Sequence, residues 1–262
     1  GNGDDFIVGG LGTDTIYGGD LDDQIWGDDI FVGTFGDLDY IYGGNGNDKI
    51  SGGGGNDRIY GGDGHDVLHG DFGNDYLYGD SGDDLISSGS GHDVVRGDEG
   101  DDILAGADGD DILYGDNPYI TSGDTSYDWG NDSLLGGSGK DKLYGHDGDD
   151  FLRGNIGSDK MWGGAGADEF WWTESDQETG VIDYIYDFST AEGDVLDLDQ
   201  LITFAAHDPN DAVRLVEGST YTNVQVDLDG TQTDHGWVNL VRLHGTTGLD
   251  VDTMVANGNL LL

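Results

Sequence analysis

The chain has 262 residues, of which 51 are glycine, 55 are acidic and 9 are basic, giving a formal net charge of −46. This charge argues against nucleic acid or an anionic membrane surface as a partner. The absence of cysteine excludes disulfides and thiolate metal sites, and no run has the length of a transmembrane helix, so direct membrane insertion is not expected.

The chain begins inside a repeat, because residues 1–5 read Gly-Asn-Gly-Asp-Asp and lack the glycine pair that opens later units. No basic region followed by an apolar stretch occurs here, so this end does not read as a cleavable signal peptide. We therefore expect the sequence to be a piece of a longer protein.

Residues 43–69 define the repeat. Three consecutive units of nine residues keep glycine at places 1, 2 and 4, aspartate at place 6 and a branched aliphatic residue at place 8. Glycine allows the sharp turn, which leaves carbonyl oxygens beside the place-6 carboxylate. Places 7–9 predict a strand of about three residues whose inward side chain is at place 8. Since one unit cannot bury its own apolar residue, units must stack, and stacked turns offer oxygen ligands that suit calcium.

Counting by the place-6 aspartate gives seventeen units, and an apolar residue follows two positions later in every one. Chance does not hold two residue classes in register over so many units. We predict that the place-6 aspartates are the metal ligands: Asp5, Asp14, Asp23, Asp39, Asp48, Asp57, Asp66, Asp75, Asp84, Asp93, Asp102, Asp111, Asp132, Asp141, Asp150, Asp159 and Asp168.

Two interruptions break the spacing of nine. Seven extra residues lie near 29–35, and twelve lie near 117–128. Each falls where a turn belongs, so we expect a tolerated loop that leaves the phase of the strands unchanged. A partner-binding role or an additional metal site is the alternative.

Place 9 is rich in tyrosine and tryptophan and should face outward, one residue after the inward position. We expect these rings to cover the sheet face and to stabilise their cross-strand neighbours. A flat platform for sugar binding is the alternative.

The pattern changes after Asp168. Alternation of β-forming residues predicts strands at 213–216, 221–228 and 237–243, and a short helix is expected at 199–204. A stack of repeats needs an end-cap over its last apolar layer. We therefore divide the chain into a repeat block, residues 1–171, and a capping region, residues 172–262.

The nonapeptides make residues 1–171 resemble the RTX block of secreted Gram-negative proteins. The resemblance implies an all-β fold, a right-handed parallel β-roll with two nonapeptides per coil, followed by the small β-rich cap. It also implies that each calcium lies between turns i and i+2, so that Asp48 shares an ion with Asp66, and Asp57 with Asp75. Roughly ten to fifteen ions are expected from this repeat logic.

The remaining chain resembles the C-terminal target region of proteins exported by type I secretion, in the version common at the ends of very large adhesins. The matching segments are residues 166–170, 183–188, 193–198, 226–230, 241–245 and 257–262. The resemblance implies an exporter as partner during secretion and an extracellular or cell-surface location. Dense carboxylates and abundant glycine should keep the chain unfolded where calcium is scarce, and binding outside the cell would fold it.

No enzyme site is expected in these residues, since neither H-E-x-x-H nor G-x-S-x-G occurs. The sequence therefore favours a monomeric calcium-binding module at the C-terminal end of a large exported protein, most simply an adhesin. The alternatives are a non-catalytic module of a secreted polysaccharide epimerase or protease, and the C-terminal part of a pore-forming toxin.

Overall fold

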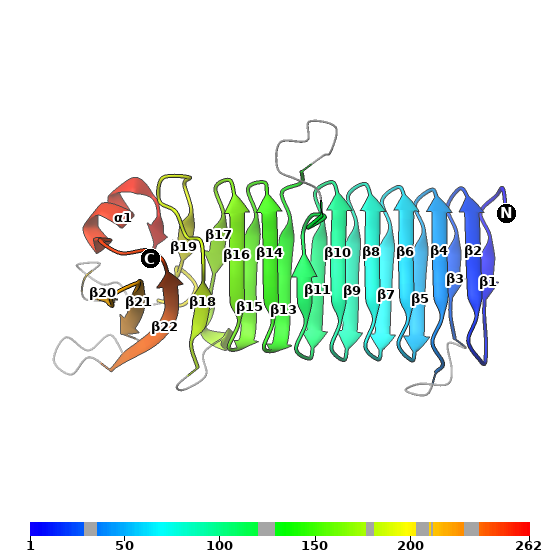
Figure 1. Cartoon of the computed structure of the whole chain (residues 1–262), viewed down its shortest axis with the longest axis horizontal. Coiled ribbons are helices and arrows are strands. Elements are labelled where there is room, and N and C mark those ends of the chain that lie inside the picture. The colour runs from blue at the N-terminus through cyan, green and yellow to red at the C-terminus, as the bar shows by residue number, and fades with distance from the viewer. Residues whose placement is uncertain (29–35, 120–128, 177–180, 203–209, 211, 228–235) are drawn as a thin grey trace.

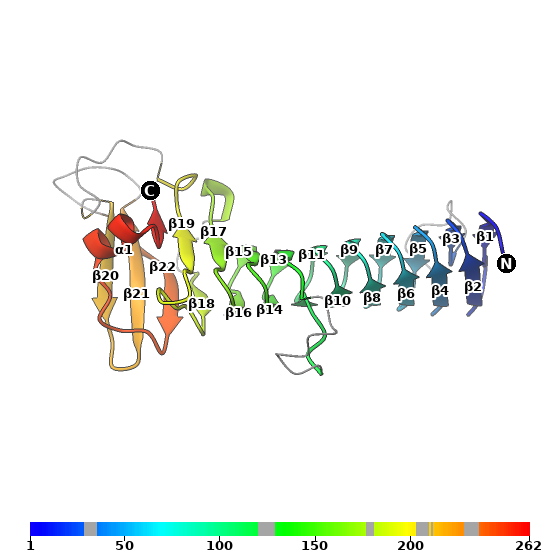
Figure 2. The same cartoon turned by 90° about the horizontal axis from the view of Figure 1, so that it is seen from above.

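The structure is a computed structural model that describes residues 1–28, 36–119, 129–176, 181–202, 210, 212–227 and 236–262. The strands stack side by side from the N-terminus to the C-terminal region in an elongated body (Figure 1). Seen from above, they form two facing layers along most of its length (Figure 2). This arrangement is a parallel β-roll, as the repeats predict.

One sheet has eleven strands, all paired in parallel, and contains every odd-numbered strand except β21. In spatial order it contains β1 Phe6–Val8, β3 Gln24–Trp26, β5 Lys49–Gly54, β7 Val67–Phe72, β9 Leu85–Ser90, β11 Ile103–Asp108, β13 Ser133–Gly139, β15 Phe151–Gly157, β17 Glu169–Trp171, β19 Val195–Asp197 and β23 Leu260–Leu261.

The second sheet has twelve strands, and the last three of them pair with one another in antiparallel fashion. Its order is β2 Thr15–Asp20, β4 Tyr40–Asn45, β6 Arg58–Asp63, β8 Tyr76–Ser81, β10 Val94–Glu99, β12 Ile112–Tyr114, β14 Lys142–Asp147, β16 Lys160–Ala165, β18 Asp183–Ile185, β22 Trp237–His244, β21 Tyr221–Asp227 and β20 Val213–Glu217.

The place-8 side chains form the core between the two sheets. Every one from Ile16 to Phe170 is buried, and Ile7 packs against this cluster from the N-terminal end. Equivalent residues of successive coils lie opposite each other, as with Ile41 and Ile59. Each unit thus buries its single apolar residue only against its neighbours, as the spacing predicts.

The strands are longer than the three residues predicted. Most strands of the roll have six residues, such as β6, because places 1–3 also pair with the coil next to them. Gly44 lies opposite Gly62, and Asn45 opposite Asp63. The ladder of backbone hydrogen bonds therefore continues into the turn, which a count of places 7–9 does not reveal.

Both insertions leave the strand register intact. β2 pairs with β4 in phase across the first insertion, with Ile16 opposite Ile41. β11 pairs with β13 across the second, with Leu104 opposite Leu134. The prediction that the strands keep their phase is confirmed; residues 29–35 and 120–128 lie outside the described residues.

Place-9 rings stack along the outer face of the second sheet. Tyr17, Tyr42, Tyr60 and Tyr78 stack with centroids 4.8–4.9 Å apart, and the guanidinium of Arg96 continues the row 4.7 Å from the Tyr78 ring. A second row runs through Tyr114, Tyr144, Trp162, Tyr186 and His244. Since each ring covers the face of its neighbour, the stacking supports the cross-strand role over a sugar platform.

The C-terminal region closes the end of the roll with the predicted strands β20, β21 and β22. Residues 199–202 form a turn rather than the start of the expected helix, and 203–204 lie outside the described residues. A helix occurs instead at α1, Val251–Asn257, whose N-terminal N–H at Thr253 is capped by Asp250 and whose end is closed by Gly258. Within the described part of the chain, no helix is long and apolar enough to cross a membrane.

Candidate metal centre

The turns stack with their carbonyl groups directed at glycine. Places 2 and 4 have positive φ, as at Gly62 (116°) and Gly64 (145°). A Cβ at Gly62 would collide with the carbonyl oxygen of Gly44, and one at Gly64 with that of Gly46. The close approach of successive coils therefore favours glycine at these two positions. Seven other residues nevertheless take positive φ there: Leu21, Asp71, Asp80, Asp98, Ala107, His146 and Asn155.

The place-6 aspartates form two ladders, one along each edge of the roll. In each step the backbone N–H of one aspartate donates to Oδ1 of the aspartate one coil later, at 2.7 Å from Asp48 to Asp66 and from Asp57 to Asp75. One ladder contains Asp5, Asp23, Asp48, Asp66, Asp84, Asp102, Asp132, Asp150 and Asp168. The other contains Asp14, Asp39, Asp57, Asp75, Asp93, Asp111, Asp141 and Asp159.

The pairs that the resemblance assigns to a shared ion are thus direct neighbours. Fifteen of the seventeen aspartates, from Asp23 to Asp168, are buried, whereas Asp5 and Asp14 at the N-terminal end are partly exposed.

The second carboxylate oxygen of these residues is buried without a partner. Oδ2 lacks a hydrogen-bond partner in every place-6 aspartate from Asp14 to Asp168. A buried oxygen of this kind is costly unless a donor or a cation meets it. The recurrence of this orphaned atom in turn after turn is the structural observation that points to a cation as its partner.

In most turns a backbone carbonyl of the next coil faces the same space as the orphaned oxygen. A methyl group on Gly106, at place 1, would lie 2.5 Å from both Asp111 Oδ2 and the carbonyl oxygen of Gly136 in the next coil. The space is confined and is lined by hard oxygen atoms, the ligands that calcium prefers. The residues therefore fit a calcium ion.

Side chains alone do not complete a metal site. Among the residues that the structure describes, no group of three or more His, Asp or Glu side chains is placed to hold an ion. The remaining ligands would come from the turn carbonyls, which is why glycine and aspartate recur together.

Burial raises the pKa of the place-6 carboxyl groups. It brings that of Asp66 to about 7, that of Asp84 to about 8 and that of Asp102 to about 9, although the N–H of the preceding aspartate offsets part of the effect. Neighbouring aspartates raise these pKa values further. At neutral pH, folding a carboxyl group into such a site costs on the order of 4 kcal/mol relative to the ionised group in the unfolded chain. A few such groups therefore exceed the net stability of a typical domain, about 5–15 kcal/mol.

Two aspartates beyond the predicted set continue the ladders into the C-terminal region. Asp159 donates its N–H to Asp183 Oδ1 at 3.0 Å, and Asp168 donates to Asp194 Oδ1 at 3.2 Å. Both keep the spacing to a buried aliphatic residue two positions later, Ile185 and Leu196. The sequence signal was therefore present, but these positions lack the glycines by which units were counted.

Ser88 departs from the pattern at place 1. It is the only non-glycine residue at this place among the described units, and its hydroxyl donates to the Gly106 carbonyl oxygen at 2.9 Å. The serine side chain thus occupies the space that is open in other turns. We expect the site beside Asp93 to be weakened or lost.

Place 5 adds an exposed ladder that the sequence interpretation missed. Asn47 Oδ1 accepts the N–H of His65, and Nδ1 of His65 accepts the N–H of Asp83, both at 2.8 Å. Asn74 and His92 act in the same way on the other edge. The side chains at this place connect successive turns on the solvent side.

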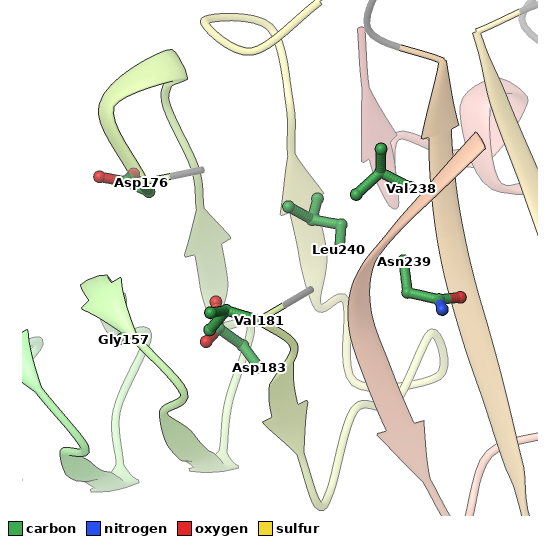
Figure 3. Close-up of a pocket in the computed structure, with 7 residues that line it drawn as sticks. All are labelled: Gly157, Asp176, Val181, Asp183, Val238, Asn239 and Leu240. Atoms are coloured by element: carbon green, nitrogen blue, oxygen red, sulfur yellow. The ribbon is translucent and has the colours of Figure 1, made fainter. Parts of the chain in front are cut away.

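A small pocket lies where the roll meets the C-terminal strands (Figure 3). Asp176 and Asp183 face it from one side, and Val238 and Leu240 of β22 from the other (Figure 3). Both carboxylates already have partners: Asp176 binds Arg153 at 2.8 Å, and Asp183 accepts the Trp172 indole N–H at 2.7 Å. The contact of Arg153 with Asp176 links the repeat block to the capping region beside this pocket.

The solved structures that contain segments similar to this chain include the following two. A subunit of the mannuronan C5-epimerase of Azotobacter vinelandii is 27% identical over 60% of this chain and 80% of that subunit, with a TM-score of 0.43. The extracellular lipase LipA of Serratia marcescens is 18% identical over 90% of this chain and 42% of the lipase, with a TM-score of 0.37. No curated protein matches the chain.

The family comparison covers the repeat block. The model of the RTX calcium-binding nonapeptide repeat matches residues 1–25, 25–59, 34–68, 60–95, 87–117, 127–161 and 144–171. Together these matches span more than half of the sequence and coincide with the stacked turns described above. The chain therefore belongs to the RTX calcium-binding nonapeptide repeat family.

Proposed function

We propose that this chain is a non-catalytic, calcium-dependent folding module at the C-terminal end of a large exported protein, an adhesin, and that it supports type I secretion. The observation that carries the proposal is the row of orphaned, buried Oδ2 atoms from Asp14 to Asp168. RTX nonapeptide repeats bind calcium, and the carboxylate and carbonyl oxygens of the turns supply the donor set for it.

The turns bury carboxylate groups whose negative charge a bound cation can offset. In the folded chain, the ladder N–H groups hold each carboxylate in place through Oδ1 and leave Oδ2 directed at a carbonyl of the neighbouring coil. Without added positive charge, the buried place-6 groups resist ionisation and repel one another. Bound calcium supplies that charge and accepts both kinds of oxygen.

Folding of the chain should therefore depend on the calcium concentration around it. The metal-free chain carries a net charge of −46 and 51 glycines, so both repulsion and chain entropy favour an open state at neutral pH. An open state suits passage through a narrow exporter. At extracellular calcium, several weak sites add their binding free energies to folding, which would hinder return of the chain into the cell.

The C-terminal region supports a role for the cap as the starting point of folding. Asp183 and Asp194 present the first rungs of both ladders to Asp159 and Asp168. The apolar layer of the roll is covered there by residues of the cap, including Leu196 and Val241. If the C-terminal end leaves the exporter first, coils would add to this preformed end.

A calcium titration followed by circular dichroism tests the proposal. Sheet content should rise cooperatively with calcium in the whole chain, and a chain cut after residue 171 should need more calcium. Export of the chain from cells should slow when external calcium is chelated. The proposal would be overturned if neither the sheet content nor the rate of export depended on the calcium concentration.

The adhesin assignment is tested by the sequence that precedes residue 1 in the native protein. It predicts long tandem extracellular repeats there. A catalytic domain would instead assign the module to a secreted enzyme, and apolar helices with acylated lysines would assign it to a pore-forming toxin.

A further inference from the structure

Both insertions begin at the same place of the nonapeptide. In both cases the residue before the insertion stands at place 2 and is an aspartate: Asp28 precedes 29–35, and Asp116 precedes 117–128. In each turn the chain returns at place 3 and reaches its place-6 aspartate, Asp39 or Asp132, in register. Insertion and aspartate therefore occur together twice in the chain.

These two aspartates differ in conformation from others at place 2. Asp71, Asp80 and Asp98 have φ near +72° to +81°, whereas Asp28 and Asp116 lie outside the left-handed region. In the left-handed conformation the side chain turns to the outer sheet face, where Asp98 binds Arg96 at 2.6 Å. Asp28 and Asp116 are buried, as Asp98 is, but do not share this left-handed conformation.

At the first insertion, a carboxylate takes the position that a carbonyl has elsewhere. Next to place 2 of an ordinary coil lies the place-2 carbonyl oxygen of the coil before, as Gly44 O lies next to Gly62. Next to Gly53, the three nearest atoms all belong to Asp28: its Cβ lies 2.8 Å from the Cβ position, and its backbone nitrogen and Oδ2 both lie at 3.4 Å. Gly54 also donates its N–H to this carboxylate at 3.2 Å, in place of the carbonyl that would normally receive it.

At the second insertion, the carboxylate is left without a partner. Asp116 has 0% of its surface exposed, and neither of its oxygens has a partner with hydrogen-bond geometry. It lies against Asp132 of its own turn and Asp150 of the next coil. Burial raises its pKa to about 9, with a smaller contribution from the charges of these two aspartates. The N–H groups of Asp147 and Gly130 offset only part of this effect.

The same relations hold at both insertions. Asp28 raises the pKa values of Asp39 and Asp57 by its charge, just as Asp116 is affected by Asp132 and Asp150. In each case the extra aspartate lies beside the place-6 aspartate of its own turn and that of the following coil. A third carboxylate in such a position is destabilising unless a cation is present.

We propose that Asp116 and Asp28 are additional calcium ligands, which place a carboxylate oxygen where ordinary turns offer a backbone carbonyl. The proposal rests on the calcium binding proposed above for the turns. Replacing a neutral ligand by a charged one strengthens a calcium site. The two insertion turns would therefore hold their ions at lower free calcium than the ordinary turns do.

Partial substitution by terbium, a stronger-binding probe of oxygen sites, locates these ions directly. Crystals of the whole chain grown in calcium would be soaked with less terbium than there are sites, and the anomalous peaks ranked by height. The strongest peaks are expected beside Asp116 and Asp28. Peaks in ordinary turns, with none beside Asp116, would overturn this inference and leave the proposed function standing, whereas no peak in any turn would contradict the proposed function itself.

Three variants separate a ligand from a merely buried residue. Asp116→Asn and Asp28→Asn keep the shape of the side chain but remove its charge, and should lower terbium affinity at their own turn roughly tenfold, following the dependence of calcium affinity on ligand charge. Asp71→Asn is the matched control, since Asp71 is also at place 2 but is exposed and turned toward Ser51. Equal terbium peaks at position 116 in D116N and D71N would refute the assignment.

Discussion

Removing one place-6 carboxylate should change how steeply the stability of the roll depends on calcium. Asp66 is buried, accepts the Asp48 N–H at 2.7 Å and has an orphaned Oδ2. Asp66→Asn keeps the hydrogen-bond acceptor but replaces the orphaned oxygen by an amide that cannot ligate calcium. The fold of the turn should persist while its ion is lost.

The magnitude follows from linkage. Each ion bound by the folded chain and released on unfolding adds about 1.4 kcal/mol to the free energy of unfolding per tenfold rise in free calcium. The slope for Asp66→Asn should therefore be lower than that of the parent by about 1.4 kcal/mol per decade. The slope is the right quantity because the substitution also removes a buried charge, which shifts stability by an amount that does not vary with calcium.

Urea unfolding at several saturating concentrations of calcium, followed by circular dichroism, measures this slope. Asp63→Asn is the matched control, because Asp63 lies at exposed place 3 of the same turn and loses the same charge. Its slope should equal that of the parent. If Asp66→Asn also retains the parent slope, the orphaned oxygen is not a calcium ligand and the reasoning fails.

Three further results are expected. Gly61→Ala should bind one calcium fewer in equilibrium dialysis, because its methyl group would meet both Asp66 Oδ2 and the Gly79 carbonyl oxygen. Gly3→Ala is the control and should lose no calcium, because the space around Gly3 is open. Equal stoichiometry in the two variants would count against the site. Ser88→Gly should reopen the blocked turn and steepen the calcium slope by about 1.4 kcal/mol per decade, and an unchanged slope would show that the serine does not exclude an ion. In chelator, the metal-free chain should gain sheet content as the pH falls from 8 toward 5. The pKa of a buried carboxyl such as that of Asp84 is about 8 in the folded chain and far lower in the unfolded chain, so the folded state loses stability as the pH rises from the unfolded to the folded pKa. Constant ellipticity over this range would contradict the raised pKa values.

The repeat register could be predicted because a single spacing records both a turn and a core position. The interval from Asp57 to Ile59 locates a ligand and a buried side chain at once, and the parallel stacking follows from the need to bury that side chain. The structure then confirms the stacking and the phase of the strands across both insertions.

The parts that were missed depend on contacts between coils. Strand length was underestimated because pairing of Gly44 with Gly62 is a property of stacked turns and has no signal within one unit. Asp183 and Asp194 were missed because they are not preceded by glycine at places 1, 2 and 4, although each keeps the aliphatic residue two positions later. The burial of Asp116 could not be predicted from the sequence, since aspartates at place 2 range from exposed, at Asp71, to buried, at Asp98.

Complete removal of divalent ions from the whole chain at neutral pH is the most direct test. Small-angle scattering and circular dichroism should then show an expanded chain without sheet, and calcium should restore both compactness and ellipticity. A chain that stays compact and β-rich in chelator would show that the buried carboxylates are stabilised by something other than bound metal.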